Sequence, residues 1–320
     1  MTPQQTMPRA RATQSPLNVI RGFLIGMAEL VPGISGGTVA LVLGVYERAL
    51  RAVNSLASAV KALIAGPDRL RGFRREIAGI EWWLILPALV GMVGALLFAA
   101  GPVKHLVETY PENARGLFFG LVVASFVVLF RIMPRGRSTV LGIVGDIAII
   151  VIAGAVAFTL VGLAGGQTVE EPSVWFIALA AALAVCALVV PGLSGSFFLL
   201  ALGLYEPTLQ AVADRDFAYL GIFLVGALVG LFTIAKVVSF LLEHRRRITL
   251  VVMIGLMAGS LRALWPWQGG PGGSEGHGTL LAPTDPLVPI LLAILGAAVV
   301  IGFIVAESMI LRRRSARPVE

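Results

Sequence analysis

Two copies of one motif constrain the fold of this chain more strongly than any other feature. Residues 28–47 read AELVPGISGGTVALVLGVYE, and residues 187–206 read ALVVPGLSGSFFLLALGLYE. In each copy a proline followed by glycine, at Pro32 or Pro191, interrupts an apolar run. Because proline lacks the N–H that an α-helix needs and glycine lets the backbone turn, each run is expected to fold as two half-helices.

The composition places these broken helices in a membrane. Of the 320 residues, 57% are hydrophobic and 13% are charged, and the mean hydropathy is +0.90, far above the range of soluble globular proteins. In lipid, a broken backbone is tolerated only where protein buries it or a water-filled cavity meets it. Breaks at matching places in two repeats therefore predict a binding site at the breaks.

The residues that follow each break have the character of an anion site. Ser35 and Ser194 stand where they can cap the second half-helix. The first turn of a helix carries unpaired amides and the positive end of the helix dipole, which together attract anions. We therefore expect an anionic substrate to contact the amides and hydroxyls of both motifs, at Ser35, Gly36, Gly37, Thr38, Ser194, Gly195 and Ser196.

The remaining apolar segments complete two repeats. The first repeat, 17–165, is predicted to hold a broken segment at 17–47 and membrane spans at 83–101, 116–133 and 139–164. The second, 174–311, is predicted to hold a broken segment at 174–205 and spans at 218–242, 249–266 and 287–311. Cytoplasmic tails, 1–16 and 312–320, flank the repeats, and the first is expected to be disordered.

The basic residues decide how the broken segments lie in the membrane. Each segment either crosses once or returns as a re-entrant hairpin. If both are hairpins, the basic loop 48–76, the basic stretch Arg245–Arg247 and both termini share one side, and few basic residues face the other side. This asymmetry is the positive-inside pattern, so the sequence predicts hairpins and cytoplasmic termini.

The repeat continues beyond the motif. Leu89-Val90-Gly91 matches Leu224-Val225-Gly226, and Gly120-Leu121 matches Gly255-Leu256. One hairpin plus about three crossings is an odd number of passes, so the second repeat is expected to be inverted relative to the first. The predicted fold class is thus an all-α integral membrane protein with an inverted-topology repeat, each repeat being one Pro-Gly-broken re-entrant hairpin plus about three transmembrane helices, as in alternating-access transporters.

Charged residues within the apolar segments are candidates for function. Glu29 precedes the first break, and a carboxylate inside the membrane costs roughly 2.5–3.5 kcal/mol on insertion scales, so it is expected to face a cavity unless it lies near the interface. Lys236 and Arg262 lie in second-repeat spans without a basic counterpart in the first repeat. Either cation can meet an anionic substrate or pair with Glu29 or Asp146.

Enzyme and cofactor signatures are missing from the sequence. There is no Walker sequence, no His-Glu-x-x-His and no Gly-x-Ser-x-Gly motif. Cys186 is the single cysteine, and the three histidines lack the spacing of metal ligands. We therefore predict no catalytic residues, no cofactor and no metal. The net charge of +7 is explained by membrane topology rather than by a nucleic-acid partner.

The motif pair resembles the bacterial PopT-type polyprenyl-phosphate transporters, also catalogued as domain of unknown function 368. The resemblance rests on AELVPGISGGT, on VVPGLSGS and on the two Gly-x-Tyr-Glu endings, and it extends over about residues 17–311. It implies a multi-pass protein of the bacterial plasma membrane that returns undecaprenyl phosphate from the outer to the inner leaflet for cell-wall precursor synthesis.

Two other functions remain open at this stage. Undecaprenyl pyrophosphate phosphatases also have inverted re-entrant repeats, with a Pro-Gly-x-Ser-Arg-Ser-Gly signature, but Gly36 and Gly195 stand here at the arginine position. Without that arginine, charge on a transferred phosphoryl group is poorly stabilised. A transporter or channel for a small anion can use the same helix ends.

Inward movement of a lipid phosphate needs a source of energy. A phosphomonoester carries about −1.5 to −2 charges, so its return against an inside-negative potential of about 100 mV is uphill by about 3.5–4.6 kcal/mol. We therefore expect a proton or a sodium ion to be co-transported. Glu29 is the best candidate to take a coupling proton, because burial favours the neutral form of a carboxyl group.

Overall fold

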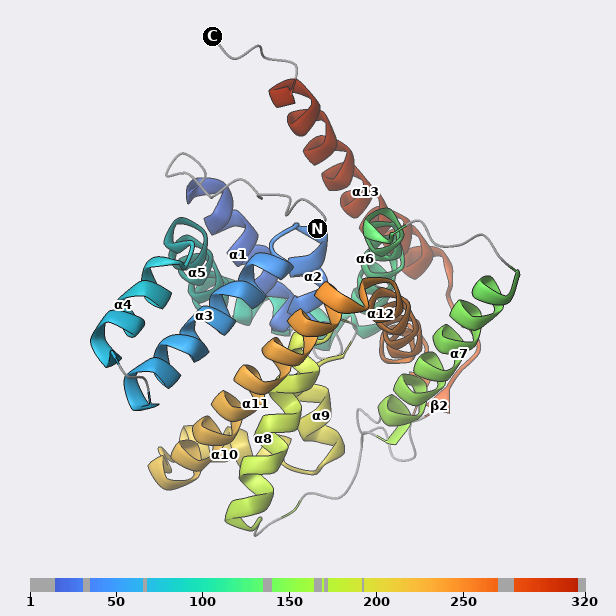
Figure 1. The fold of residues 1–320 in the computed structure, drawn as a ribbon. Coiled ribbons are helices and arrows are strands. Elements are labelled where there is room, and N and C mark those ends of the chain that lie inside the picture. Colours follow the sequence, from blue (N-terminus) through green and yellow to red (C-terminus); the bar gives the residue numbers. More distant parts are fainter. Residues whose placement is uncertain are drawn as a thin grey trace.

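The computed structural model is almost entirely helical in the residues that it describes (Figure 1). These are residues 15–30, 35–65, 68–134, 140–163, 169, 172–191, 193–269 and 279–315. The break residues Pro32, Gly33 and Gly192 lie outside this part of the chain, as do most of the first predicted tail and residues 316–320.

The first half of the chain forms helices α1 to α7. They are α1 (Ser15–Glu29), α2 (Gly36–Val42), α3 (Tyr46–Ala65), α4 (Arg69–Ala78), α5 (Trp82–Thr109), α6 (Pro111–Ile132) and α7 (Val140–Leu163). The basic loop predicted at 48–76 is therefore largely helical. Helix α5 runs well past the end predicted at residue 101 and contains Pro102, because an internal proline removes one helical hydrogen bond without always ending the helix.

The second half forms helices α8 to α13 and a small hairpin. They are α8 (Val174–Val189), α9 (Gly195–Ala201), α10 (Tyr205–Ala213), α11 (Phe217–His244), α12 (Arg246–Ser260), the 3-10 turn η2 (Leu261–Leu264), strands β1 (Gln268–Gly269) and β2 (Thr279–Leu280), which pair antiparallel, and α13 (Leu287–Ser315). In the described residues, α5, α6, α7, α11 and the α12–η2 segment are long and apolar enough to cross a membrane, and α8 and α13 contribute shorter apolar stretches. The protein is an all-α, multi-pass membrane protein.

The two motif copies form the same local structure. In both, a seven-residue helix, α2 or α9, is followed two residues later by a glycine with positive φ, 67° at Gly44 and 69° at Gly203. This backbone conformation favours glycine, which explains the repeated Leu-Gly of the motif. The turn makes the second half-helices shorter than predicted, and it places Tyr46 and Tyr205 at the start of the next helix rather than at the end of the motif helix.

Glycine contacts bring equivalent helices together in the two halves. Helix α1 packs along α5, and α8 packs along α11. A Cβ atom at Gly91 would lie 2.0 Å from the Val19 carbonyl oxygen, and one at Gly226 would lie 2.1 Å from the equivalent Ala178 oxygen. Helix α6 packs on α13, and α12 packs on α7, again through glycine contacts. The last helix of each half, α7 or α13, therefore packs on a helix of the other half.

Ion pairs gather several helix ends at one end of the molecule, here called the ion-pair end. Arg246 beside the α11–α12 turn binds Glu47 at 2.7 Å, and Arg48 binds Glu81 before α5, with Nε and Oε2 3.1 Å apart. Arg247 pairs with Asp146 of α7 and donates to the Pro134 carbonyl after α6. Asp146 therefore pairs with Arg247, and not with Lys236 or Arg262.

Both ends of the first broken segment contact the start of α5. The Asn18 amide in α1 donates to the Trp83 carbonyl oxygen at 2.8 Å, and Arg48, just beyond the segment, binds Glu81. Helix α1 thus starts at the ion-pair end and runs parallel to α5. Helix α8 runs parallel to α11, which ends there, so α1 and α8 point in opposite directions.

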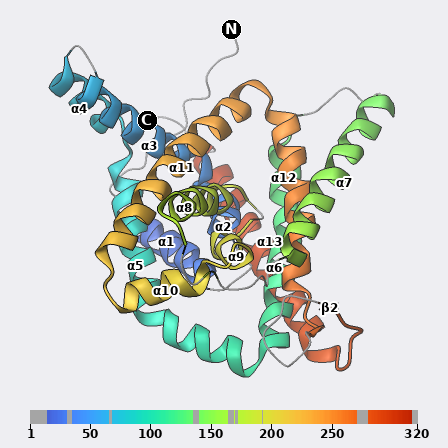
Figure 2. The ribbon, with the colours of Figure 1, turned by 90° about the horizontal axis from the view of Figure 1, so that it is seen from below.

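The motif helices occupy the middle of the molecule. Figure 2 shows α2, α8 and α9 surrounded by α5, α6, α11 and α12. The largest buried cluster joins α2 and the start of α3 to α6, α11 and α12, with Leu43 2% exposed and Met257 fully buried. The described residues of α2 therefore pack against protein, and Gly36 and Thr38, at the start of this helix, are both buried.

The close packing of α8 on α11 gives a paired test of stability. Gly226→Val should destabilise the protein by about 1–3 kcal/mol or more, because the added side chain meets the Ala178 backbone. Gly221→Val, on the same helix with nothing within 4 Å of its Cβ position, is the control. Unfolding temperatures in detergent measure both, and equal temperatures would contradict the packing.

Candidate functional site

The start of α2 is capped by a carboxylate from the other side of the break. The Gly36 amide donates to Oε1 of Glu29 at 2.8 Å. Ser35 occupies the N-cap position as expected, but its hydroxyl makes no capping hydrogen bond. The predicted serine cap is therefore wrong in this detail. Glu29 accepts from the first amide of the helix, and the Thr38 amide, which a serine cap could bind, already donates to the Ser35 backbone carbonyl. The protein's own anion occupies a position where an anionic substrate was expected.

The other residues of the first motif differ in what they offer a ligand. The Thr38 amide already donates to the Ser35 carbonyl at 3.0 Å, as the first turn of α2 closes. Ser35 is 3% exposed, and its hydroxyl has no hydrogen-bond partner among the described residues. Such a buried, unpaired hydroxyl is unusual, since buried polar groups are normally satisfied, and it marks a place where a polar ligand atom would be stabilised.

The second motif copy keeps its hydroxyl groups together. The Ser194 and Ser196 oxygens lie 2.9 Å apart and share a hydrogen bond at the start of α9. Gly195 packs on α8, where an added Cβ would be 2.6 Å from the Ala184 carbonyl oxygen. The hydroxyl pair can donate or accept, so it is chemically suited to phosphate oxygens, but its alignment depends on the close contact at Gly195.

The start of α2 lies against the last turn of α8, directly before the second break. A Cβ at Gly37 would be 3.0 Å from the Leu188 carbonyl oxygen and 3.2 Å from that of Val189. The Tyr46 hydroxyl, after the α2–α3 turn, donates to the Val189 carbonyl at 2.9 Å. These contacts join the two halves next to both breaks. Tyr46 is 6% exposed, so it belongs to the core.

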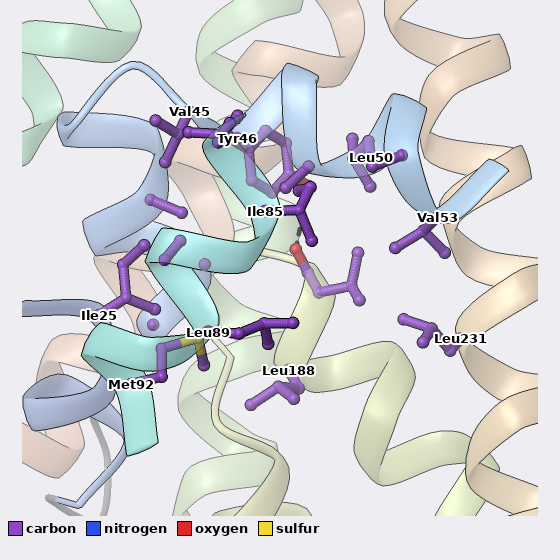
Figure 3. A pocket seen from close by; sticks show the side chains of 18 of the residues that line it. Ile25, Val45, Tyr46, Leu50, Val53, Ile85, Leu89, Met92, Leu188 and Leu231 are labelled. Carbon is purple, nitrogen blue, oxygen red and sulfur yellow. Dashed lines mark hydrogen bonds between the residues drawn. The ribbon is translucent and has the colours of Figure 1, made fainter. Parts of the chain in front are cut away.

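An apolar cavity of about 470 Å³ opens beside this junction (Figure 3). Its wall is almost entirely apolar, although Glu29, Gly36, Gly37 and Tyr46 are among the residues that line it. Figure 3 shows Leu188 and Leu231 of the second half on the side away from Val45 and Tyr46. The cavity therefore combines a motif that can hold an anion with a wall suited to a hydrocarbon.

The two predicted cations lie apart from this cavity. The Arg262 guanidinium stacks on the Phe158 ring at 4.4 Å and donates to the Phe158 carbonyl, in space left by Gly162. Lys236 is exposed on α11. Neither side chain lines the cavity. Among the described residues, no group of three His, Cys, Asp or Glu side chains could hold a metal ion.

The structure therefore unites Glu29, Ser35, Gly36 and Gly37 with two features that the sequence analysis missed. The first is the bond from Tyr46 to Val189, and the second is the cavity. The repetition of Tyr46 as Tyr205 was a visible signal, but a contact across 143 positions has no local pattern. The cavity wall draws on α1, α2, α3, α5, α8 and α11, whose proximity only the tertiary fold determines.

Comparison with known proteins decides the family. A family model described as VCA0040-like, undecaprenyl phosphate translocase-like, matches residues 25–273. The chain belongs to this family. A polyprenyl-phosphate transporter of Vibrio cholerae serotype O1 is 32% identical over 255 residues, 78% of this chain and 77% of the relative. A polyprenyl-phosphate transporter of Staphylococcus aureus is 27% identical over 265 residues, 78% of this chain and 86% of the relative.

The match to the undecaprenyl phosphate translocase-like family covers both motif copies. It begins before Glu29 and extends beyond α12, so it takes in every residue that lines the cavity. No solved structure matches the chain. The resemblance expected from the motif pair is thereby confirmed.

The bond between the halves gives a second paired test. Tyr46→Phe should lower the free energy of unfolding by about 1 kcal/mol, because the Val189 carbonyl loses its buried donor. Tyr205→Phe is the matched control, since within the described part of the chain the Tyr205 hydroxyl makes no hydrogen bond. If thermal unfolding in detergent shows the same loss for both variants, the bond does not join the halves.

Proposed function

We propose that this protein moves undecaprenyl phosphate from the outer to the inner leaflet of the bacterial plasma membrane, where the lipid is reused for cell-wall precursors. The family and the names of two relatives support a lipid phosphate as substrate. The observation that carries the proposal is the position of the anion-binding motif in the wall of an apolar cavity. A small-anion transporter has no need of such a wall.

The phosphate is held by the amides and hydroxyls of the two motifs. In the present conformation Glu29 occupies the Gly36 amide, so phosphate can take that donor only when the carboxylate leaves. The buried Ser35 hydroxyl and the Ser194–Ser196 pair supply further donors. Arg262 and Lys236 stay predicted sources of positive charge, to be reached in another conformation.

Exchange between Glu29 and phosphate provides a route to energy coupling. A proton taken up by Glu29 neutralises the carboxylate and weakens its hold on the Gly36 amide, which then becomes available to the lipid phosphate. Loss of the proton restores the carboxylate and expels the phosphate. The alternative is a sodium ion that travels with the phosphate. In either case the co-transported cation offsets the electrical cost of inward movement.

The arrangement of the halves supports an inverted repeat with re-entrant hairpins. Helices α1 and α8 enter from opposite ends, and the first broken segment returns to the end from which it started. We propose that each half carries one hairpin and three crossings, with repeats at 17–165 and 174–311. Rocking of one half against the other would open the central breaks to each leaflet in turn.

Hydrolysis of a pyrophosphate lipid is less well supported. An arginine side chain at position 195 would meet the Ala184 carbonyl, since even a Cβ there would be 2.6 Å away. At position 36 an arginine would displace the Glu29 carboxylate. We therefore propose that the protein transports the lipid without hydrolysing it, and that restoring arginine at Gly36 does not create activity.

Purified protein in proteoliposomes tests the function directly. Movement of undecaprenyl phosphate between leaflets should depend on the protein, with no phosphate released from the pyrophosphate lipid. Ser35→Ala combined with Ser194→Ala should weaken lipid binding, because two donors to phosphate are lost. Robust phosphate release would favour the enzyme, and movement of inorganic phosphate alone would favour a small-anion transporter.

The role of Glu29 has its own prediction. Glu29→Gln should bind the lipid but carry it at a rate that no longer depends on pH, because glutamine cannot exchange the coupling proton. Transport is measured across a pH series with the wild type beside it. An unchanged rate and pH profile would make Glu29 a structural cap, and a dependence on sodium alone would assign the coupling to that ion.

In the proposed topology both termini and the α3–α4 segment face the cytoplasm, and the first part of α3 lines the cavity. A single cysteine at the exposed Lys61 should resist an impermeant thiol reagent added to intact cells, whereas one at the exposed Thr284 should react. Cys186 is replaced in both variants. Labelling of the Lys61 position from outside would show that the protein has the opposite orientation in the membrane.

A further inference from the structure

We infer that the apolar cavity binds the isoprene units nearest the phosphate, between the two halves of the protein. This inference rests on the proposed function and adds a site for the hydrocarbon chain of the substrate. Movement of the phosphate group alone would leave the chain in the surrounding lipid and would need no cavity. The position, lining and composition of the cavity each bear on the inference.

The cavity continues directly from the residues that bind the anion. Glu29, Gly36 and Gly37 belong to its wall, and the Gly36 amide is the donor that the phosphate would take from Glu29. The first isoprene carbon is bonded to a phosphate oxygen. A phosphate that replaced Glu29 at the Gly36 amide would therefore place the start of the chain at the cavity.

The rest of the wall suits a branched hydrocarbon. Ala52, Val53 and Leu56 line it from α3, and Leu89 and Met92 line it from α5. The Tyr46 hydroxyl, one of the few polar groups, is already bonded to the Val189 carbonyl. The volume of about 470 Å³ falls within the range of ordinary ligand sites, so a short part of one chain is accommodated while the remainder extends into the bilayer.

Both halves contribute to this wall. Leu188 and Val189 come from α8 and Leu231 from α11, whereas the other lining residues belong to the first half, to α1, α2, α3, α5 and the turns beside them. Any movement of one half against the other therefore changes the cavity itself. The hydrocarbon chain would be bound while the halves are in this arrangement and released when they separate. Binding of the hydrocarbon would thus depend on the conformation of the transporter.

A photoreactive polyprenyl phosphate tests the site in the wild-type protein. With a diazirine on the first isoprene unit, labelling should fall on peptides of α3 and on the end of α8, near Ala52 and Leu188, and excess undecaprenyl phosphate should suppress it. Labelling confined to α7 or α13, away from the cavity, would place the chain in the bilayer and overturn the inference.

A cavity-filling variant gives a functional readout. Ala52→Phe should raise the concentration of undecaprenyl phosphate needed for half-maximal transport about tenfold or more. The reason is that a change of one methylene group in an apolar pocket alters substrate discrimination by ~10–200-fold. Ala65→Phe, the same change at an exposed position on the same helix, is the control. Inhibition by geranyl phosphate should weaken in Ala52→Phe, and inhibition by inorganic phosphate should not.

The outcomes separate this inference from the proposed function. If the wild type moves no undecaprenyl phosphate, the function is wrong. If it does, but Ala52→Phe matches Ala65→Phe and labelling avoids the cavity, only the site for the chain is wrong. Labelling that a diacyl phospholipid suppresses as well as undecaprenyl phosphate would reassign the cavity to bulk lipid. Should Ala52→Phe fail to fold, the labelling of the wild type decides.

Discussion

The arrangement depends on how a broken backbone is satisfied within a membrane. A helix that stops inside the bilayer leaves amides that water cannot reach, and each unsatisfied group costs several kcal/mol. Here the Gly36 amide finds the Glu29 carboxylate, and the α2 and α9 segments lie at the centre of the protein. This solution carries a consequence for function, because a donor satisfied by a carboxylate from the same chain can be offered to another anion when that carboxylate is neutralised.

Close contacts through glycine hold this centre in place. Helices α1 and α5 approach until the Val19 backbone leaves no room for a side chain at position 91, and α8 and α11 do the same at position 226. Without a hydrophobic driving force between helices in lipid, such backbone contacts are a main source of association. The pairs α6–α13 and α7–α12 each join a helix of one half to a helix of the other. The cavity is lined by residues of both halves, so a movement of one half against the other would change its shape.

The site that we propose would meet two kinds of surface on its substrate. The motif offers amides and hydroxyls to an anion, and the wall offers aliphatic side chains to a hydrocarbon. A lipid phosphate has both features, and the description of the family to which the chain belongs names such a lipid, undecaprenyl phosphate.

The sequence alone determined the membrane class, the helix breaks and the family. These follow from local or periodic properties: apolar length, proline and glycine chemistry, and a motif long enough to recognise twice. The tertiary structure decided which groups meet. Glu29 caps Gly36, Tyr46 bonds to Val189, Asp146 pairs with Arg247, and Arg262 stacks on Phe158. The Glu29 cap spans only the break, but the other contacts join residues about 100 positions or more apart. A contact between such distant residues depends on how the helices pack, and no local sequence pattern encodes that packing.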